Sequence, residues 1–356
     1  MIDLNFAALA TELKIDALLI SGLPNVRYVS GFTGSNGIVL ASAEAPVLFT
    51  DPRYQIQATQ EKSSGFKVRL VRRGPLSHAV AKVLAKGKYK KIGFEKGRLT
   101  YEDYLALKEK LPLNVELVPT GGVIEKLRMV KNAAEAAKIK RSVATNSKAF
   151  EAAKKRIKPG VKENDVAAEI DYQMRRHGAE GTAFETIVAF GERSALPHAH
   201  PTGKRLARDE LVLIDMGSCQ DGYTSDMTRV VFLEKPKPKV AALYRAVLEA
   251  QLAAIDAVRE GVTAERVDRA ARQVLAAHGL DKQFTHSTGH GLGLEIHEPP
   301  RVGKKDKTKL VEGMAITIEP GAYLEGVGGV RIEDTILVTK TGCEVLTPTS
   351  KELTVL

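Results

Sequence analysis

Four acidic residues stand where the surrounding sequence predicts buried strands. Asp215 follows the apolar run LVLI, and Asp226 stands directly before a second apolar run, MTRVVF. Glu319 ends the strand-like segment MAITIE, and Glu333 lies within GVGGVRIEDTILVT (326–339), which also has the pattern of a strand. A carboxylate is costly to bury unless a cation or hydrogen bonds neutralise it, so this placement calls for a chemical explanation.

Two divalent cations would explain the placement, because their four positive charges balance four carboxylates that would otherwise repel one another. A neutral His290, from the segment HSTGHGLGLEIHEPP (286–300), would complete the metal-binding set. Oxygen ligands with one imidazole and no thiolate suit manganese, cobalt or zinc. Two such metals, about 3.5–4 Å apart, would share a bridging hydroxide as the nucleophile of hydrolysis. The alternative is four separate loop carboxylates with no common role, since Asp favours turns.

The composition limits the classes of protein to which the chain can belong. Of its 356 residues, 44% are hydrophobic and 27% are charged, which predicts a soluble globular protein. No apolar run approaches the roughly 18 residues of a membrane span, and the acidic N-terminus is unlike a signal peptide. Two cysteines indicate no disulfide framework, which favours a cytoplasmic location. The net charge of +10 is spread along the chain without a nucleic-acid-binding signature, so neither nucleic acid nor membrane is an expected partner.

Residues 1–128 alternate short strand-like and helical segments, which predicts an α/β domain. DALLIS, GIVLAS, APVLFT, KIGFE and VELVP have the pattern of strands, and LSHAVAKVLA and YEDYLALKEKL that of helices. The glycine-rich stretch GFTGSNG (31–37) has the wrong spacing for a phosphate-binding loop and indicates a tight turn.

Residues 129–356 contain an internal repeat. The segments GVKENDVAAEIDYQMRRHG (160–178) and GVTAERVDRAARQVLAAHG (261–279) align without gaps, from a shared Gly-Val to a shared His-Gly. A predicted helix precedes each segment and strand-like segments follow it, which indicates two similar halves. His177 and His278 are expected to cap helices rather than to act in catalysis. A site shared by the halves would lie between them and take ligands from both.

The ordered motifs LIDMG, SDMTR, TGHGLGLEIHE, IEPG and RIED resemble those of the pita-bread metallopeptidases, which include methionine aminopeptidase, aminopeptidase P and prolidase. The resemblance covers about residues 130–350 and implies an α+β pita-bread catalytic domain with a pseudo-two-fold repeat. It also implies a dinuclear centre, with manganese first and cobalt or zinc as alternatives. The implied metal ligands are Asp215, Asp226, His290, Glu319 and Glu333.

The same resemblance implies roles for residues around the metals. Three histidines would bind substrate and stabilise the tetrahedral intermediate: His198, His286 and His297. Glu319 would carry the proton from the attacking water. Arg331, two residues before Glu333 and on the same face of the predicted strand, would support the ligands from behind. His200 has no role in the resemblance and is expected at the surface.

The segments RYVSGFTGSNG and LFTDPRYQIQA resemble the creatinase-like N-terminal domain of short aminopeptidase P and prolidase proteins. Methionine aminopeptidase normally lacks such a domain, and creatinase lacks the metal ligands. The resemblance therefore implies hydrolysis of the N-terminal Xaa-Pro bond of proline-containing peptides or dipeptides by a homodimer. Two alternatives stay open: a strict Xaa-Pro dipeptidase, and a pita-bread protein that binds partners without catalysis.

A dipeptidase should hold the free carboxylate of its proline product, and a bidentate arginine is the natural device for this. The candidates are Arg53 in TDPRY, Arg193 and Arg301. The TDPRY segment is hypothesised to reach an active site, including that of a neighbouring subunit. The alternative is that Asp51 and Pro52 form only a turn at the end of a strand.

Overall fold

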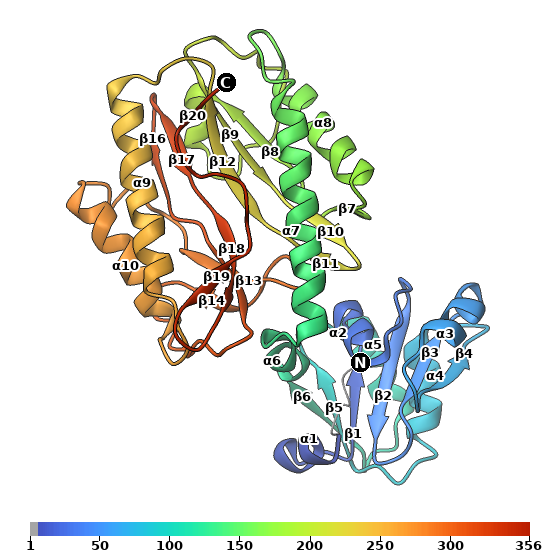
Figure 1. Ribbon diagram of the computed structural model, residues 1–356. Helices are drawn as coiled ribbons and strands as arrows, with labels where there is room; N and C mark the ends of the chain where they lie inside the picture. Colours follow the sequence, from blue (N-terminus) through green and yellow to red (C-terminus); the bar gives the residue numbers. More distant parts are fainter. Residues whose placement is uncertain (1–5) are drawn as a thin grey trace. The chain divides into compact units, whose positions relative to one another are not determined.

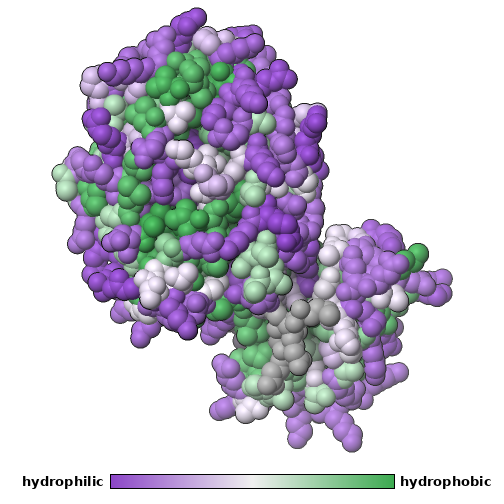
Figure 2. Space-filling model, viewed as in Figure 1, coloured by the Kyte–Doolittle hydropathy of each residue, from purple (hydrophilic) through white to green (hydrophobic). Residues whose placement is uncertain are grey.

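The computed structural model describes residues 6–356, so the first five residues of the acidic N-terminal segment lie outside the described part. The chain divides after Leu127 into two compact units (Figure 1). No helix within residues 6–356 is long and apolar enough to cross a membrane. Hydrophilic residues cover most of the visible surface and are broken by hydrophobic patches, in keeping with charges spread along the sequence (Figure 2).

The first unit is built on a mixed six-stranded sheet with the strand order β4-β3-β2-β1-β5-β6. β2 runs antiparallel to both of its neighbours, while β1, β5 and β6 are parallel to one another, as are β3 and β4. The strands are β1 (Ala17–Ile20), β2 (Gly37–Ser42), β3 (Val47–Thr50), β4 (Lys67–Leu70), β5 (Lys91–Glu95) and β6 (Glu116–Thr120). The helices are α1 (Phe6–Leu13), α2 (Leu23–Ser30), α3 (Gln55–Glu61), α4 (Leu76–Leu84), α5 (Tyr101–Lys110) and α6 (Val123–Met129).

Both faces of this sheet are buried, because alternate residues of β1 enter different cores. Leu19 packs in the core that includes α4, whereas Leu18 packs in the core that includes α2. The sequence analysis does not predict α2, which has a proline in its first turn and ends at Gly31 with φ 79°. Gly31 is also the first residue of the expected glycine-rich turn, where a positive φ favours glycine.

The second unit has two pairs of helices, one for each half of the repeat (Figure 1). They are α7 (Ala133–Lys154) with α8 (Glu163–Arg176), and α9 (Pro238–Asp256) with α10 (Ala264–Ala277). His177 and His278 are the C-cap residues of α8 and α10, and the glycines that follow have φ 104° and 70°. The capping role predicted for both histidines is therefore confirmed.

The strands of the second unit lie between these helix pairs and form four-stranded, five-stranded, three-stranded and two-stranded sheets. The four-stranded sheet contains β8 (Ile187–Phe190), β9 (Leu211–Met216), β12 (Met227–Phe232) and β20 (Thr354–Val355). The five-stranded sheet contains β13 (Gly289–Gly291), β14 (Glu298–Val302), β15 (Ala315–Ile318), β18 (Asp334–Val338) and β19 (Cys343–Val345). The smaller sheets contain β7 (Gly181–Thr182), β10 (Ser218–Gln220) and β11 (Tyr223–Thr224), and β16 (Gly321–Leu324) and β17 (Gly328–Arg331). Of the short 3-10 helices, η1 (Pro52–Tyr54) belongs to the first unit and η2 (Gly191–Ala195) to the second.

The antiparallel pair β9–β12 is buried on both faces. Leu213 packs in a core shared with α9 and α10, whereas Val212 packs in a core shared with α7 and α8. The strand period places Asp215 on the same face as Leu213. The register pairs Asp215 with Thr228, and Asp226 stands two residues before Thr228. One face of this ladder therefore presents both acids toward the second half.

The segment 326–339 forms two strands, so the expectation of one continuous strand is wrong. β17 pairs with β16, whereas β18 pairs with β15 and β19. Between them the backbone N–H of Glu333 donates to the carbonyl oxygen of Thr228 on β12 at 3.2 Å, which interrupts both ladders. Ile332 still enters the core, while Arg331 and Glu333 both bond to the hydroxyl of Thr228. The expected shared face of Arg331 and Glu333 is therefore kept across the break.

A buried ion cluster ties β12 to β18 beside this break. Arg229 donates to the carboxylate of Asp334 at 2.7 Å and to the carbonyl oxygen of Glu333 at 2.6 Å. Lys351 and Gln251 also donate to Asp334, at 2.5 and 2.8 Å. Burial alone would raise the pKa of Asp334, but the charges of Arg229 and Lys351 lower it overall. The cluster thus holds the backbone next to Glu333.

Asp334→Ala should lower the free energy of unfolding of the second unit by about 3–5 kcal/mol, because it leaves buried cations without a partner. The matched control is Asp209→Ala, which removes the exposed partner of Lys237 and should leave the unfolding midpoint nearly unchanged. Urea unfolding followed by circular dichroism measures both, since the chain has no tryptophan. Equal losses in the two variants would contradict a structural role for the cluster.

Candidate metal centre

The residues singled out in the sequence meet at one cavity of about 820 Å³ in the second unit. Its lining includes all four predicted acids and the predicted imidazole: Asp215, Asp226, Glu319, Glu333 and His290. It also includes the other predicted site residues: His198, His286, His297 and Arg331. The lining residues of the first half end at Asp226 and those of the second half begin at His286, 60 positions later, so they share one chamber only because the two halves of the unit pack together.

Strand pairing explains how the acids of the second half come together. β15 and β18 are antiparallel neighbours, and their register pairs Ile318 with Asp334. Glu319 follows Ile318 and Glu333 precedes Asp334, so both acids lie at the same end of this pair. β13 lies on the other side of β15 and carries His290.

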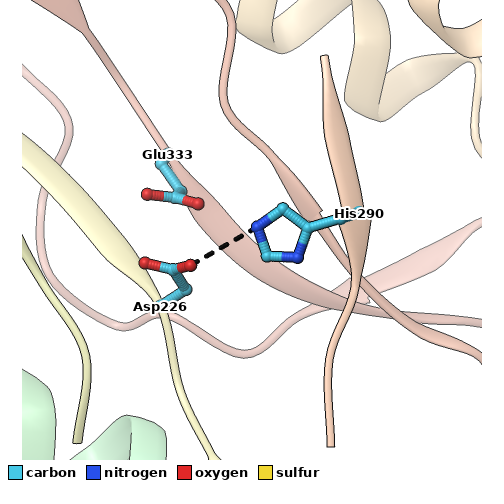
Figure 3. A group of neighbouring side chains, drawn as sticks. All are labelled: Asp226, His290 and Glu333. Carbon is cyan, nitrogen blue, oxygen red and sulfur yellow. Dashed lines mark ion pairs between the residues drawn. The ribbon is translucent and has the colours of Figure 1, made fainter. Parts of the chain in front are cut away.

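Asp226, His290 and Glu333 point toward one another, and one potential ligand atom of each lies within 4.8 Å of the others (Figure 3). Nε2 of His290 is 3.5 Å from a carboxylate oxygen of Asp226 and 3.4 Å from one of Glu319. Nδ1 of His290 lies 3.0 Å from the carbonyl oxygen of Gly291. A carbonyl oxygen only accepts, so Nδ1 carries a proton, and Nε2 is the ring nitrogen that faces the acids and could bind a metal.

Three carboxylate oxygens in this cavity are buried without a hydrogen-bond partner: Oδ1 of Asp215, Oδ1 of Asp226 and Oε1 of Glu333. Burial, and then the negative charges of the neighbouring acids, raise the pKa of Asp226 and of Glu333 well above the usual range. Burial also raises the pKa of Glu319 against the opposing influence of His290. Unpartnered oxygens in a crowded anionic site are costly, and divalent cations would supply the missing partners. The donor set therefore fits oxygen-preferring divalent metals.

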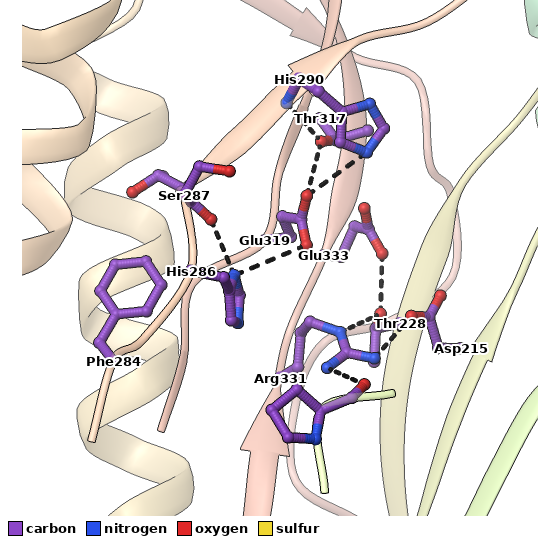
Figure 4. Close-up of polar contacts among 12 residues, drawn as sticks. Asp215, Thr228, Phe284, His286, Ser287, His290, Thr317, Glu319, Arg331 and Glu333 are labelled. Atoms are coloured by element: carbon purple, nitrogen blue, oxygen red, sulfur yellow. Dashed lines mark hydrogen bonds and ion pairs between the residues drawn. The ribbon is translucent and has the colours of Figure 1, made fainter. Parts of the chain in front are cut away.

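Arg331 links the acids of the two halves (Figure 4). Its Nη2 donates to Oδ2 of Asp215 at 2.5 Å, and its Nε donates to the hydroxyl of Thr228 at 3.1 Å. The Thr228 hydroxyl donates in turn to Oε2 of Glu333 at 2.7 Å. One oxygen of Asp215 and one of Glu333 are thereby held in place, while the other oxygen of each stays unpartnered.

Tyr323 and Thr228 belong to this site, although the sequence analysis does not predict them. The Tyr323 hydroxyl accepts from Nη1 of Arg331 at 2.6 Å and lies 2.8 Å from Nε2 of His286. Burial raises the pKa of Tyr323 to about 12, so the phenol keeps its proton and donates it to His286. The spacing of two from Asp226 to Thr228 on one strand is a signal that would have identified Thr228.

The four histidines of the cavity lining other than His290 differ in their surroundings. Burial and then the charge of Arg331 lower the pKa of His286 to about 4, and both of its ring nitrogens are engaged, by Tyr323 and by the carbonyl oxygen of Ser287. Burial and then His290 lower the pKa of His297, whose ring centre lies 4.4 Å from that of His290. His198 is exposed on the cavity wall. His200 pairs with an exposed acid at the rim, as expected for a surface residue.

The three candidate arginines lie in different places. Arg301 lines the cavity, and no acidic partner contacts its guanidinium within residues 6–356. Arg193 is not part of the lining, because its guanidinium pairs with Glu163. Arg53 lies in the first unit and pairs with Asp51, whose side chain caps a short helical turn directly after β3.

The profile of metallopeptidase family M24 matches residues 137–340, and that of the creatinase/prolidase N-terminal domain matches residues 5–130. An Xaa-Pro dipeptidase of Pyrococcus horikoshii is 40% identical over 341 residues, which cover 96% of this chain and 95% of the relative. An uncharacterised peptidase of Bacillus subtilis is 37% identical over 345 residues, which cover 97% of each chain.

Solved structures with the same fold cover nearly the whole chain. An Xaa-Pro dipeptidase from Bacillus anthracis is 40% identical with a TM-score of 0.94, covering 98% of this chain and 97% of the other. An X-Pro aminopeptidase from Thermotoga maritima is 37% identical with a TM-score of 0.90, covering 97% of this chain and 99% of the other.

Asp226→Asn should raise the melting temperature of the metal-free protein by about 2–4 °C, because it removes one of the repelling charges. The gain should widen as the pH rises, since a carboxyl whose pKa is raised by folding stabilises the folded state only while it is protonated. Addition of Mn²⁺ should raise the melting temperature of the wild type more than that of the variant.

Differential scanning fluorimetry with chelator and with Mn²⁺ measures both effects. Glu312→Gln, which neutralises an exposed acid outside the cavity, is the control and should respond to Mn²⁺ like the wild type. An equal response to Mn²⁺ in Asp226→Asn and the wild type would rule out a metal at this position.

Proposed function

This chain belongs to metallopeptidase family M24, and from that membership and its cavity we propose that it hydrolyses the N-terminal Xaa-Pro bond of peptides. The observation that carries the proposal is a cavity lined by the four predicted acids, three of which have a buried oxygen without a hydrogen-bond partner. Proteins similar to this chain over nearly its whole length are named for Xaa-Pro hydrolysis, as dipeptidases and as an aminopeptidase.

We propose that two divalent ions are held by the residues expected from the sequence, with manganese as the first choice and cobalt or zinc as alternatives. The proposed ligands are Asp215, Asp226, His290, Glu319 and Glu333. Bound there, the ions would polarise the scissile carbonyl and lower the pKa of a bound water. Five intact ligand positions also argue against the alternative of a partner-binding protein without catalysis.

Glu319 is the proposed carrier of the proton. Burial raises its pKa, which makes its carboxylate a better proton acceptor than an exposed glutamate. The hydroxyl of Thr317 donates to one of its oxygens at 3.3 Å and so limits its orientation. The ring nitrogen of proline must gain a proton as it leaves, and Glu319 would deliver the one taken from the attacking water.

His297 and His198 are the proposed donors to the oxyanion that develops on the scissile carbonyl. The lowered pKa of His297 keeps its ring neutral at pH 7, so it acts as a hydrogen-bond donor and adds no charge. His286 has both ring nitrogens engaged, so we assign it to support Tyr323 and Arg331. This assignment narrows the substrate-binding role that the resemblance implies for all three histidines.

Arg301 is the proposed partner of a free proline carboxylate, because it lines the cavity and its guanidinium has no acidic partner within the described residues. A substrate ending at proline would then be preferred, which favours the Xaa-Pro dipeptidase alternative. In a longer peptide, which an aminopeptidase would accept, the proline carboxyl group is part of the next peptide bond and carries no charge. The rates on a dipeptide and on a tripeptide therefore distinguish the two activities.

The proposed form of the protein is a cytoplasmic homodimer. The two cysteines, Cys219 and Cys343, are free, which suits a reducing compartment. The homodimer follows from the family resemblance. Light scattering would show twice the mass of the 38.6 kDa chain, and a value for one chain would rule out the dimer.

Removal of metal by a chelator should abolish hydrolysis of Ala-Pro, and Mn²⁺ should restore it. Asp226→Asn should lower kcat by at least about 10²-fold under the same Mn²⁺ concentration, because a ligand of the metal is lost. Release of proline measures both. Full activity with chelator, or no hydrolysis of any Xaa-Pro peptide with Mn²⁺, Co²⁺ or Zn²⁺, would refute the proposed function.

Arg301→Ala should lower kcat/KM for Ala-Pro by about tenfold to a hundredfold, the range for loss of a charged hydrogen bond. The same variant should change kcat/KM for Ala-Pro-Ala little, because that proline has no free carboxylate. Arg53→Ala is the matched control and should leave both rates unchanged. Equal losses on the two substrates would exclude Arg301 as the carboxylate partner, and a loss confined to Arg53→Ala with Ala-Pro would transfer that role to Arg53.

A further inference from the structure

A fully buried carboxylate, Glu163 at the start of α8, holds the loop that carries His198. The backbone N–H groups of Phe190 and Thr202, at the two ends of this loop, donate to its two oxygens at 2.9 Å each. The Thr202 hydroxyl donates at 2.6 Å, and Nε of Arg193 donates to both oxygens at 3.1 Å. The Glu163 side chain therefore holds together the two ends of a thirteen-residue loop, residues 190–202.

Arg193 connects Glu163 to the part of the loop next to His198. Its Nη2 donates to the carbonyl oxygen of His200 at 2.8 Å, two residues beyond His198. His198 itself is exposed on the cavity wall and makes no hydrogen bond of its own within the described residues. Its position is therefore set through the backbone, which Glu163 and Arg193 hold together with Arg331, whose Nη1 donates to the carbonyl oxygen of Pro197 at 3.3 Å.

The second half of the unit holds its own histidine segment in the same way. Asp268 on α10 is 1% exposed and accepts from the backbone N–H and the hydroxyl of Thr288, at 3.2 and 2.8 Å. Nε of Arg272 donates to Asp268 at 2.7 Å, and its Nη2 donates to the carbonyl oxygen of His286 at 2.5 Å. A buried carboxylate and an arginine thus lie behind His286 as well.

An aromatic ring adds a second constraint on His286. The guanidinium carbon of Arg272 lies 4.1 Å from the ring centre of Phe284, and its Nη1 donates to the Phe284 carbonyl oxygen at 3.1 Å. The Phe284 ring stands edge-on to the His286 ring, with 5.1 Å between the centres (Figure 4). The imidazole therefore rests on a ring that Arg272 holds.

The two arrangements share their chemistry but not their positions in the repeat. The gapless alignment places Glu163 opposite Ala264, and Asp268 opposite Ala167. A buried carboxylate needs several donors to offset its desolvation, and arginine can serve it while reaching a backbone carbonyl with another N–H. In each half, a buried carboxylate and an arginine anchor a histidine segment to the repeat helix. The two carboxylates stand at different positions of the repeat.

We propose that Glu163 with Arg193, and Asp268 with Arg272, are positioning pairs that hold His198 and His286 at the reaction site. The proposal rests on the proposed function, because the histidines matter to catalysis only if the cavity hydrolyses peptides. None of the four residues lines the cavity, so each acts through the histidine segment that it holds. Misplacement of a catalytic group by about 1 Å is enough to lower a rate by about 10²-fold.

The first test compares Glu163→Gln and Arg193→Met with His198→Ala, on Ala-Pro with Mn²⁺. Each positioning variant should lower kcat by about tenfold to a hundredfold. Combined with His198→Ala, neither should lower kcat further, because the residue through which they act is already absent. Losses that multiply in the double variants would overturn the proposal. Arg193→Met keeps the test decisive if Glu163→Gln fails to fold, since its guanidinium is partly exposed.

A second readout does not depend on activity. Hydrogen exchange of the metal-free protein, followed by mass spectrometry, should speed up in residues 190–202 of Glu163→Gln and stay unchanged in the later turns of α8. Glu169→Gln is the matched control, because it removes a charge from the same helix at an ion pair with Arg156 and should alter neither readout. Faster exchange throughout the second unit would mean general destabilisation and would overturn the positioning role.

The second pair is tested by Arg272→Met with His286→Ala in the same design. The expected result is again a loss of kcat that disappears in the double variant, with faster exchange confined to residues 284–288. An inactive wild type would refute the proposed function and leave the exchange results to decide the anchoring. An active wild type with multiplying losses would refute the positioning pairs alone.

Discussion

Repulsion among buried carboxylates is the constraint on which the second unit depends. Asp215, Asp226, Glu319 and Glu333 line one cavity, and burial with mutual repulsion raises the pKa of Asp226 and Glu333 well above the usual range. Arg331 offsets part of this charge through its ion pair with Asp215. Such an arrangement destabilises the folded chain, so its persistence points to a cationic ligand. Burial lowers the pKa of His286 and of His297, so these two imidazoles add little positive charge at pH 7.

The halves of the repeat each contribute what the other lacks. The β9–β12 ladder of the first half supplies two acids on one face, because strand period and register place them there. The second half supplies His290 and two further acids from β13, β15 and the break before β18. Arg331 and the hydroxyl of Thr228 join the two sets. The site thus lies between the two halves of the second unit. Its geometry depends on how the two helix pairs pack against the strands between them.

The predicted family and fold class are confirmed by the matching profiles and by solved structures that cover nearly the whole chain: an α/β creatinase-like domain and a pita-bread unit. All the acids and histidines predicted as site residues from the sequence line the cavity. The single strand expected at 326–339 is wrong, because a backbone hydrogen bond from Glu333 to β12 competes with the ladders on either side. Tyr323 and Glu163 escape prediction, since their roles depend on contacts with other segments: His286 lies 37 residues from Tyr323, and Phe190 lies 27 residues from Glu163.

The sequence by itself determines the chemistry of this protein. Acids placed at strand ends, one imidazole among glycines and a gapless repeat already predict a metal site shared by two halves, because side-chain type and spacing are local properties. Only the tertiary structure decides which oxygen of each acid is left unpartnered, which histidines keep a free N–H and which arginine reaches the cavity. These are properties of contacts between segments far apart in the chain. The pattern of residue types along the chain carries no record of those distances.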